Sequence, residues 1–139
     1  MLGKRRRLAV LAEASFTPLD GKTALGVLRY RPEEVAAVID SSHAGRTCEA
    51  CVGVGGAIPV VADVGSAAAL GADSLLIGIA PQGGELPPAW RSLVRDALAR
   101  GWDVVSGLHV FLADDPELAA LARERGGALL DVRRTPARR

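Results

Sequence analysis

Residues 8–30 read LAVLAEASFTPLDGKTALGVLRY, and this stretch decides the fold class of the chain. Its first residues form a short apolar run that predicts a buried β-strand, and Pro18 lies in the loop that follows. Asp20 is a good N-cap for a helix reaching about Leu28, because its carboxylate can accept hydrogen bonds from the first backbone N–H groups. Strand, loop and helix in this order form one unit of an open α/β sheet, in which ligands bind at the carboxyl ends of the strands.

The alternation of strand and helix continues to the end of the chain. Patterns of apolar residues and caps predict further strands at 35–40, 58–62, 74–80, 102–106 and 128–132, and helices at 63–70, 87–100 and 116–125. Residues 41–57 are rich in glycine and small polar residues and predict a long loop. Short strands of this apolar kind predict a parallel sheet that is covered on both faces. We therefore expect one three-layer Rossmann-like α/β domain with about six mostly parallel strands in the order 3-2-1-4-5-6, and basic tails at residues 1–6 and 135–139.

Composition excludes several classes of protein. The chain has 139 residues, of which 49% are hydrophobic, so it can bury one core and is neither disordered nor fibrous. A net charge of +1 gives no reason to expect a nucleic-acid partner or an acidic membrane surface. No apolar run approaches the roughly 20 residues that span a bilayer. With two cysteines and no convincing export signal, the expected location is cytoplasmic.

The loop after the first strand argues against a dinucleotide site. Residues 13–21 read EASFTPLDG and contain one glycine, whereas the G-x-G-x-x-G fingerprint needs three for close approach of the backbone to a pyrophosphate. Phe16 stands where a P-loop would need its upstream glycine. Asp40, at the end of the second strand, is placed either to bind a ribose diol or only to cap a turn. An NAD-binding oxidoreductase domain therefore stays an alternative.

The first helix carries a polar set that suits a small anion. The set comprises Asp20, Lys22, Thr23, Arg29 and Tyr30. The start of a helix offers backbone N–H groups to a phosphate or carboxylate, and Lys22 would add a positive charge. The other interpretation is a capped helix with solvated charges.

Three predicted loops converge on one crevice, namely residues 14–23, 81–84 and 106–109. All follow strands, so they meet at the carboxyl edge of the sheet. They supply the further ligand-binding candidates Gly83, Gly84, Ser106, Gly107 and His109. No Ser–His–acid triad or carboxylate pair is evident, so the pattern assigns no catalytic residue.

Cys48 and Cys51, with His43 upstream, resemble half of a metal or redox site. A structural zinc needs four ligands, and the other candidate, His109, belongs to a different strand end. A redox pair ordinarily opens a helix, whereas these cysteines fall in the predicted loop. We expect two thiols and no metal.

Several segments together resemble one known family. They are D-x-K-T-A-x-G from Asp20, the dipeptide Arg29-Tyr30, VAAVIDSSHAGR from Val35, IPVVADVGSAAALGAD from Ile58, LLIGIAPQGGELPPAW from Leu75, VVSGLHVFLADDPELAALA from Val104 and LLDVR from Leu129. Over about residues 7–134 the chain resembles the N-terminal Rossmann-like domain of the DgcN-type D-glutamate N-acetyltransferase family. The segments IPVV and LLIGIAP with Gly83-Gly84 are also similar to CoA-binding domains of the succinyl-CoA synthetase type.

The resemblance implies acetyl transfer from acetyl-CoA to the amine of D-glutamate, with acetyl-CoA or a nucleotide as the implied ligand. In that family a P-loop domain follows this one, and no Walker-type segment is present here. We therefore expect a ligand-binding domain that is inactive by itself and belongs to a homo-oligomer. The competing hypothesis is a structural or oligomerisation module without a ligand of its own.

Overall fold

The computed structural model describes residues 7–13, 16, 22–77, 88–106 and 115–131. Its centre is a six-stranded sheet in the order β3-β2-β1-β4-β5-β6, with every neighbouring pair parallel. The strands are β1 (Leu8–Leu11), β2 (Val35–Ile39), β3 (Val60–Val61), β4 (Ser74–Ile77), β5 (Asp103–Ser106) and β6 (Leu129–Asp131). The predicted Rossmann-like fold and its strand order are confirmed.

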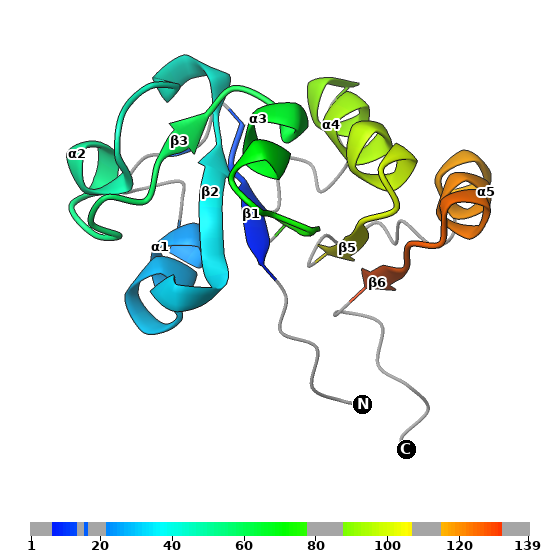
Figure 1. The fold of residues 1–139 in the computed structure, drawn as a ribbon, viewed down its shortest axis with the longest axis horizontal. Helices are drawn as coiled ribbons and strands as arrows, with labels where there is room; N and C mark the ends of the chain where they lie inside the picture. Colours follow the sequence, from blue (N-terminus) through cyan, green and yellow to red (C-terminus); the bar gives the residue numbers. More distant parts are fainter. Residues whose placement is uncertain (1–6, 14–15, 17–21, 78–87, 107–114, 132–139) are drawn as a thin grey trace.

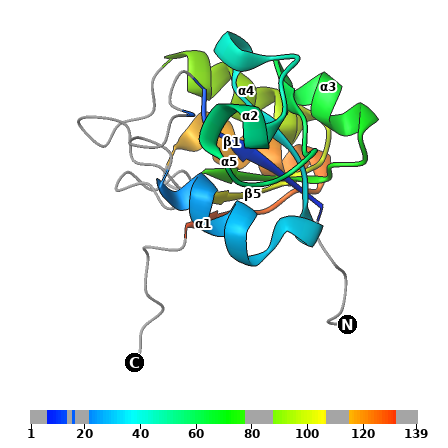
Figure 2. The same ribbon diagram turned by 90° about the vertical axis from the view of Figure 1, so that its left-hand side faces the viewer.

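Helices cover both faces of the sheet (Figures 1 and 2). The helices are α1 (Lys22–Tyr30), α2 (Cys48–Val52), α3 (Val64–Ala69), α4 (Pro88–Ala99) and α5 (Pro116–Arg125), with short 3-10 helices η1 (Pro32–Glu34) and η2 (Ser41–His43). Helices α3, α4 and α5 pack on one face and α1 and α2 on the other. No helix in these described ranges is long and apolar enough to cross a membrane.

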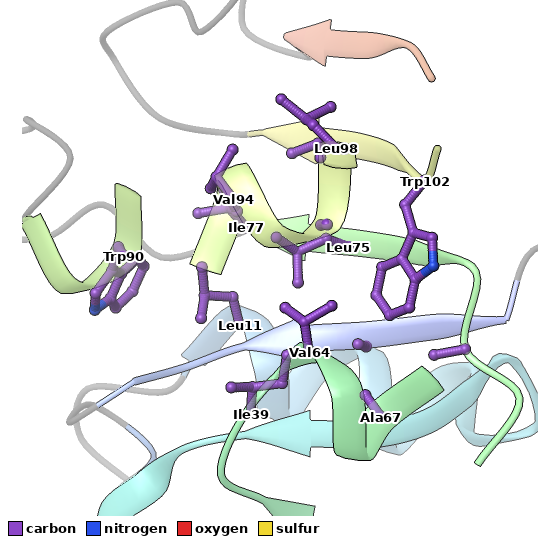
Figure 3. Packing of buried hydrophobic residues seen from close by; sticks show 14 of the residues in the cluster. Leu11, Ile39, Val64, Ala67, Leu75, Ile77, Trp90, Val94, Leu98 and Trp102 are labelled. Atoms are coloured by element: carbon purple, nitrogen blue, oxygen red, sulfur yellow. The ribbon is translucent and has the colours of Figure 1, made fainter. Parts of the chain in front are cut away.

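Successive residues of the central strands serve the two faces in turn, since side chains alternate along a strand. In β1, Ala9 and Leu11 belong to the core under α3, α4 and α5, whereas Val10 belongs to the core under α1 and α2. The larger core also holds Trp90 and Trp102 (Figure 3). A sheet that is buried on both faces therefore requires strands with apolar residues at every position.

The prediction of a long loop over residues 41–57 is wrong in part. The stretch contains η2 and the five-residue helix α2. The Thr47 hydroxyl accepts a hydrogen bond from the Ala50 N–H at 3.2 Å, and Gly53 ends the helix with φ +80°. Burial of Cys48 in the core under α1 and α2 anchors the short helix to the sheet. Such a helix depends on these contacts, because five residues are too few to be stable in isolation.

The remaining helices and strands lie close to their predicted positions, and caps mark the helix ends. Asp63 caps α3 through the Ser66 N–H at 2.8 Å, which lowers the pKa of its carboxyl below the ordinary value. Helix α5 spans the predicted residues 116–125. Pro59 precedes the edge strand β3, as expected for a residue that lacks a backbone donor. The predicted tails, and residues 78–80 of the fourth predicted strand, lie outside the described residues.

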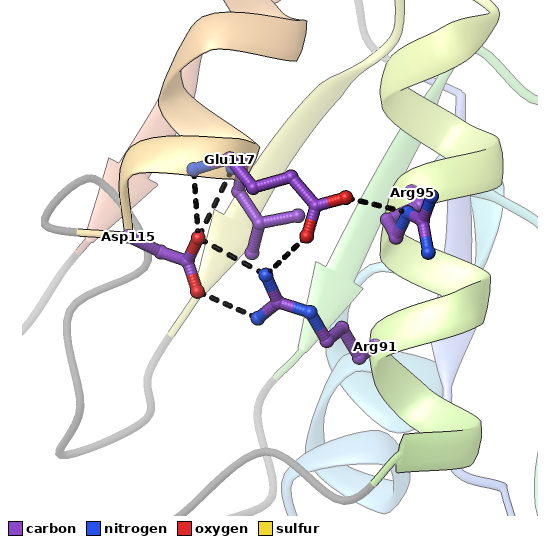
Figure 4. A network of polar contacts seen from close by, with 5 residues as sticks. Arg91, Arg95, Asp115 and Glu117 are labelled. Atoms are coloured by element: carbon purple, nitrogen blue, oxygen red, sulfur yellow. Dashed lines mark hydrogen bonds and ion pairs between the residues drawn. The ribbon is translucent and has the colours of Figure 1, made fainter.

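Helices α4 and α5 are joined by a network of charged side chains (Figure 4). Arg91 donates to both carboxylate oxygens of Asp115 at 2.6 and 3.1 Å and to Glu117 at 2.6 Å. Asp115 also caps α5 by accepting from the Glu117 and Leu118 N–H groups. The hydrogen bond from Arg91 is the main reason that the pKa of Asp115 lies below its ordinary value. This network holds α4 and α5 together and contains no predicted site residue.

Candidate functional site

The described polar groups gather at the carboxyl ends of β1 and β2. Glu13 follows β1, and Asp40 follows β2, its neighbour in the sheet. The chain after Asp40 turns at once into η2, which carries Ser41, Ser42 and His43. This is the edge at which ligands bind in open α/β sheets.

Asp40 is fully buried and organises this edge. Its Oδ1 accepts from the Ser42 N–H at 3.0 Å, which caps η2, and its Oδ2 accepts from the Phe16 N–H at 3.3 Å. The carboxylate therefore bridges the loop after β1 and the turn after β2. Of the two interpretations of Asp40 left open by the sequence, the turn cap is observed, and the ribose-binding role stays a prediction.

His43 is the second partner of Asp40. Its Nδ1 lies 2.8 Å from Asp40 Oδ2, and its side chain is 29% exposed while that of Asp40 is buried. The backbone holds the ring in place, since the His43 N–H donates to the Asp40 carbonyl at 3.0 Å. A histidine with one nitrogen on a buried carboxylate and its ring partly open to solvent is an arrangement used for proton transfer.

Glu13 ties three elements together. Its Oε1 accepts from the Ser41 N–H at 2.8 Å, and its Oε2 contacts the Ser41 hydroxyl. Its backbone carbonyl accepts from Trp90 Nε1 at 3.1 Å, which brings the start of α4 to the same place. The edge that carries His43 is thus held by β1, η2 and α4 together.

The structure does not bring all predicted site residues to one place. Lys22 and Thr23 begin α1, while Arg29 and Tyr30 end it, with Tyr30 77% exposed. Because α1 leads through η1 to the start of β2, Arg29 and Tyr30 lie toward the amino edge, away from Asp40. Asp20, Gly83, Gly84, Gly107 and His109, and most of the three predicted loops, lie outside the described residues.

Ser106 ends β5 and is buried. In the sheet, β5 is separated from β2 by β1 and β4, so three strand spacings, roughly 14 Å, divide Ser106 from Asp40. Both residues lie at the carboxyl edge, at opposite sides of its centre. A ligand that contacts both would have to span the ends of β1 and β4.

The two cysteines are differently placed from the prediction, because Cys48 opens α2 and does not lie in a loop. A helix start usually favours the thiolate. Here burial outweighs that effect and, with the nearby Cys51, raises the pKa of the Cys48 thiol to about 12. Desolvation also raises the pKa of Cys51. Thiols that stay protonated are poor redox nucleophiles, and no cluster of three or more metal-ligating side chains exists among the described residues.

The pairing of Asp40 with His43 was missed in the sequence. The spacing of His43 to Cys48 suggests only half of a metal site. An Asp at a strand end and a His three residues later predict such a pair only where the residues after the Asp form a 3-10 turn. Here Asp40 itself caps that turn.

Comparison with known proteins identifies the family. Residues 41–135, more than half of the chain, match the family model DUF1611_N, a domain of unknown function described as a Rossmann-like domain. The chain belongs to this family. The crystal structure of a DUF1611 family protein from Anabaena variabilis superposes on 96% of the chain, with a TM-score of 0.86 and 38% identity, and the match covers 38% of that protein.

Two relatives of this DUF1611_N domain carry a functional name. A protein named D-glutamate N-acetyltransferase from Tritonibacter scottomollicae is 37% identical over 115 residues, which are 83% of this chain and 32% of that protein. A protein of the same name from a Pseudoalteromonas species is 39% identical over 67 residues, which are 48% of this chain and 20% of the relative. The chain thus spans about a third or less of the length of these relatives. The resemblance to the D-glutamate N-acetyltransferase family is confirmed.

Proposed function

We propose that this domain forms the substrate-binding N-terminal part of an enzyme that transfers the acetyl group of acetyl-CoA to the amine of D-glutamate. The observation that carries the proposal is the 37% identity, over 83% of the chain, to a protein named D-glutamate N-acetyltransferase. The polar edge around Asp40 supplies the site. Because the chain spans 32% of that relative, we further propose that the domain binds ligand without completing the reaction with acetyl-CoA by itself.

The chemistry of D-glutamate fits the two kinds of groups on this edge. An α-ammonium group prefers carboxylates and neutral imidazole, which Glu13 and His43 provide at the ends of β1 and β2, with the buried Asp40 behind the ring. The two carboxylates of the substrate prefer a cation and backbone N–H groups, and Lys22 at the start of α1 is the proposed partner. Gly83 and Gly84 are the proposed contacts for the CoA phosphates, by resemblance to CoA-binding domains.

Calorimetric titration of the chain with D-glutamate, acetyl-CoA and CoA tests this proposal. We expect saturable heat with D-glutamate and with acetyl-CoA, and a much weaker response to L-glutamate. Lys22→Gln should weaken D-glutamate binding about tenfold. Arg123→Gln, on an exposed position of α5, is the matched control and should leave binding unchanged.

The competing hypotheses give different results in the same titration. A folded chain that releases no heat with any of these compounds, and that forms oligomers in light scattering, is a structural module. Saturable binding of NADH that depends on Asp40 would instead support the oxidoreductase alternative.

A further inference from the structure

We propose that His43 is the general base of the transfer reaction, with Nε2 as the atom that accepts the amine proton and Asp40 as the residue that positions the ring. This inference rests on the proposed function, because it assigns the proton acceptor for an amine substrate. It is drawn from four properties of the Asp40–His43 pair.

The first property is the direction of the hydrogen bond between the two side chains. Asp40 already accepts from two backbone N–H groups, those of Phe16 and Ser42. These two donors favour the ionised form of the carboxylate. In the proposed arrangement Nδ1 therefore carries the proton and donates it to Asp40 Oδ2 across the 2.8 Å contact. A neutral ring with its proton on Nδ1 has a lone pair on Nε2.

The second property is access. The side chain of Asp40 is buried and that of His43 is 29% exposed, so the ring extends from the protein interior toward solvent. Among the residues that the structure describes, none makes a hydrogen bond to Nε2. A substrate amine can therefore approach the atom that carries the lone pair.

The third property is rigidity. The η2 turn is held by the Asp40 cap at Ser42 and by the bond from the Ser41 N–H to Glu13 at 2.8 Å. The His43 carbonyl in turn accepts from the Arg46 N–H at 3.2 Å. A base fixed in this way loses little conformational entropy when it meets the substrate.

The fourth property is the charge around the pair. Asp40 presents its carboxylate to the His43 ring, and Glu13 adds a second carboxylate on the neighbouring strand end. Arg46 is a cation in the same region: the pKa of the Cys51 thiol is raised by desolvation, lowered by Arg46 and raised by Asp40. A substrate amine at the His43 ring would therefore meet more carboxylates than cations.

The bound α-ammonium group of the substrate first releases one proton to solvent, which leaves the neutral amine. The nitrogen lone pair of the neutral amine attacks the thioester carbonyl carbon, a C–N bond forms, and Nε2 takes the proton that the amine loses. The C–S bond then breaks, and the thiolate leaves with a proton from the imidazolium, which restores the neutral ring. General base catalysis of this kind contributes roughly 10²–10⁴-fold in rate.

Nitrogen-15 NMR of the imidazole rings tests the proton positions in the chain as it stands. The chain contains two histidines, so His43→Gln assigns the His43 signals by their loss. We expect the Nδ1–H tautomer at His43, and a saturable shift of Nε2 on addition of D-glutamate. Glutarate, which has both carboxylates but no amine, should give a shift several-fold smaller. In Asp40→Asn we expect a mixture of tautomers, with folding checked by circular dichroism.

A rate measurement with a small thioester complements the spectra, because it does not depend on binding of CoA. Acetyl transfer from S-phenyl thioacetate to D-glutamate is followed by mass spectrometry of the product. We expect the wild-type chain to accelerate the reaction saturably and His43→Gln to fall to the buffer rate.

The outcomes separate this inference from the proposed function. An Nε2–H tautomer, or a His43→Gln chain that is as fast as wild type, overturns the assignment even if D-glutamate binds. Absence of D-glutamate heat in wild type overturns the proposed function, while an Nδ1–H tautomer with accelerated transfer to another amine would still support His43 as the base.

Discussion

Replacing Gly127 by alanine should destabilise the fold strongly, for a reason that the structure gives in atomic detail. A Cβ at this position would lie 2.1 Å from the Trp102 carbonyl oxygen and 3.0 Å from its carbon. Carbon atoms pack comfortably at roughly 3.5–4.0 Å, so one of the two backbones must move. Neither can move cheaply, because the Gly127 N–H donates to Ala122 at 3.0 Å and the next residue, Ala128, bonds on both sides to β5.

Overpacking of this kind costs about 1–3 kcal/mol, and a clash with backbone belongs at the upper end of that range. We expect Gly127→Ala to lose about 3 kcal/mol of the free energy of unfolding, which for a chain of this size lowers the melting temperature by roughly 12 °C. Gly26→Ala is the matched control, because no atom lies within 4 Å of its added Cβ and Gly26 lies inside α1. Alanine is the better helix former there and should gain about 1 kcal/mol.

Urea denaturation followed by circular dichroism measures both variants against wild type. The two midpoints should move in opposite directions with unchanged m-values. If Gly127→Ala unfolds at the wild-type urea concentration, the close packing of the 126–128 segment against Trp102 is not present in solution. If both variants fall equally, the cost belongs to any glycine substitution and not to the contact.

Three further predictions follow from the described contacts. Asp115→Asn should lower the free energy of unfolding by about 1 kcal/mol at neutral pH, because it weakens the bond to Arg91. The pKa of the Asp115 carboxyl lies below its ordinary 3.8 in the folded state, so this stabilisation is present above pH 3.8 and disappears as the pH falls through the folded pKa. Urea denaturation of the variant and wild type should therefore converge in acid, and a constant gap would contradict the assignment. With a thiol pKa of about 12, Cys48 should resist iodoacetamide at pH 8 in the native chain and react in urea. Peptide mass spectrometry follows the labelling, and rapid labelling of the native chain would disprove the burial of Cys48. Trp90→Phe removes the bond to the Glu13 carbonyl and should cost about 1 kcal/mol by urea denaturation, whereas an unchanged midpoint would mean that this bond adds nothing.

The elements that the sequence predicted well share one property. Each strand is a short apolar run between turn residues, and each longer helix carries its own cap or stop, as Asp115 and Gly126 do for α5. These signals are local, so they survive without knowledge of the rest of the chain. Parallel pairing and strand order then follow from the general handedness and short connections of such folds.

The errors lie where distant contacts decide the conformation. Helix α2 is five residues long and exists because Cys48 is buried against Val38, Val60 and Leu28, residues that are far apart in sequence. Arg29 and Tyr30 belong to the same short polar segment as Lys22, yet the length of α1 carries them to the other end of the helix. Residues that are close in sequence therefore lie at opposite ends of the helix.

By itself the sequence determined the layers and the order of the strands, because periodicity and caps act over a few residues; the edge at which we expect a ligand to bind follows from that order. It also marked Asp40 as an acid at a strand end. Only the tertiary structure decided what Asp40 does: the loop after β1 brings the Phe16 N–H to one oxygen, and the η2 turn folds His43 back onto the buried carboxylate. A hydrogen-bonded pair of this kind depends on backbone geometry within fractions of an ångström, and only the packed sheet fixes that geometry.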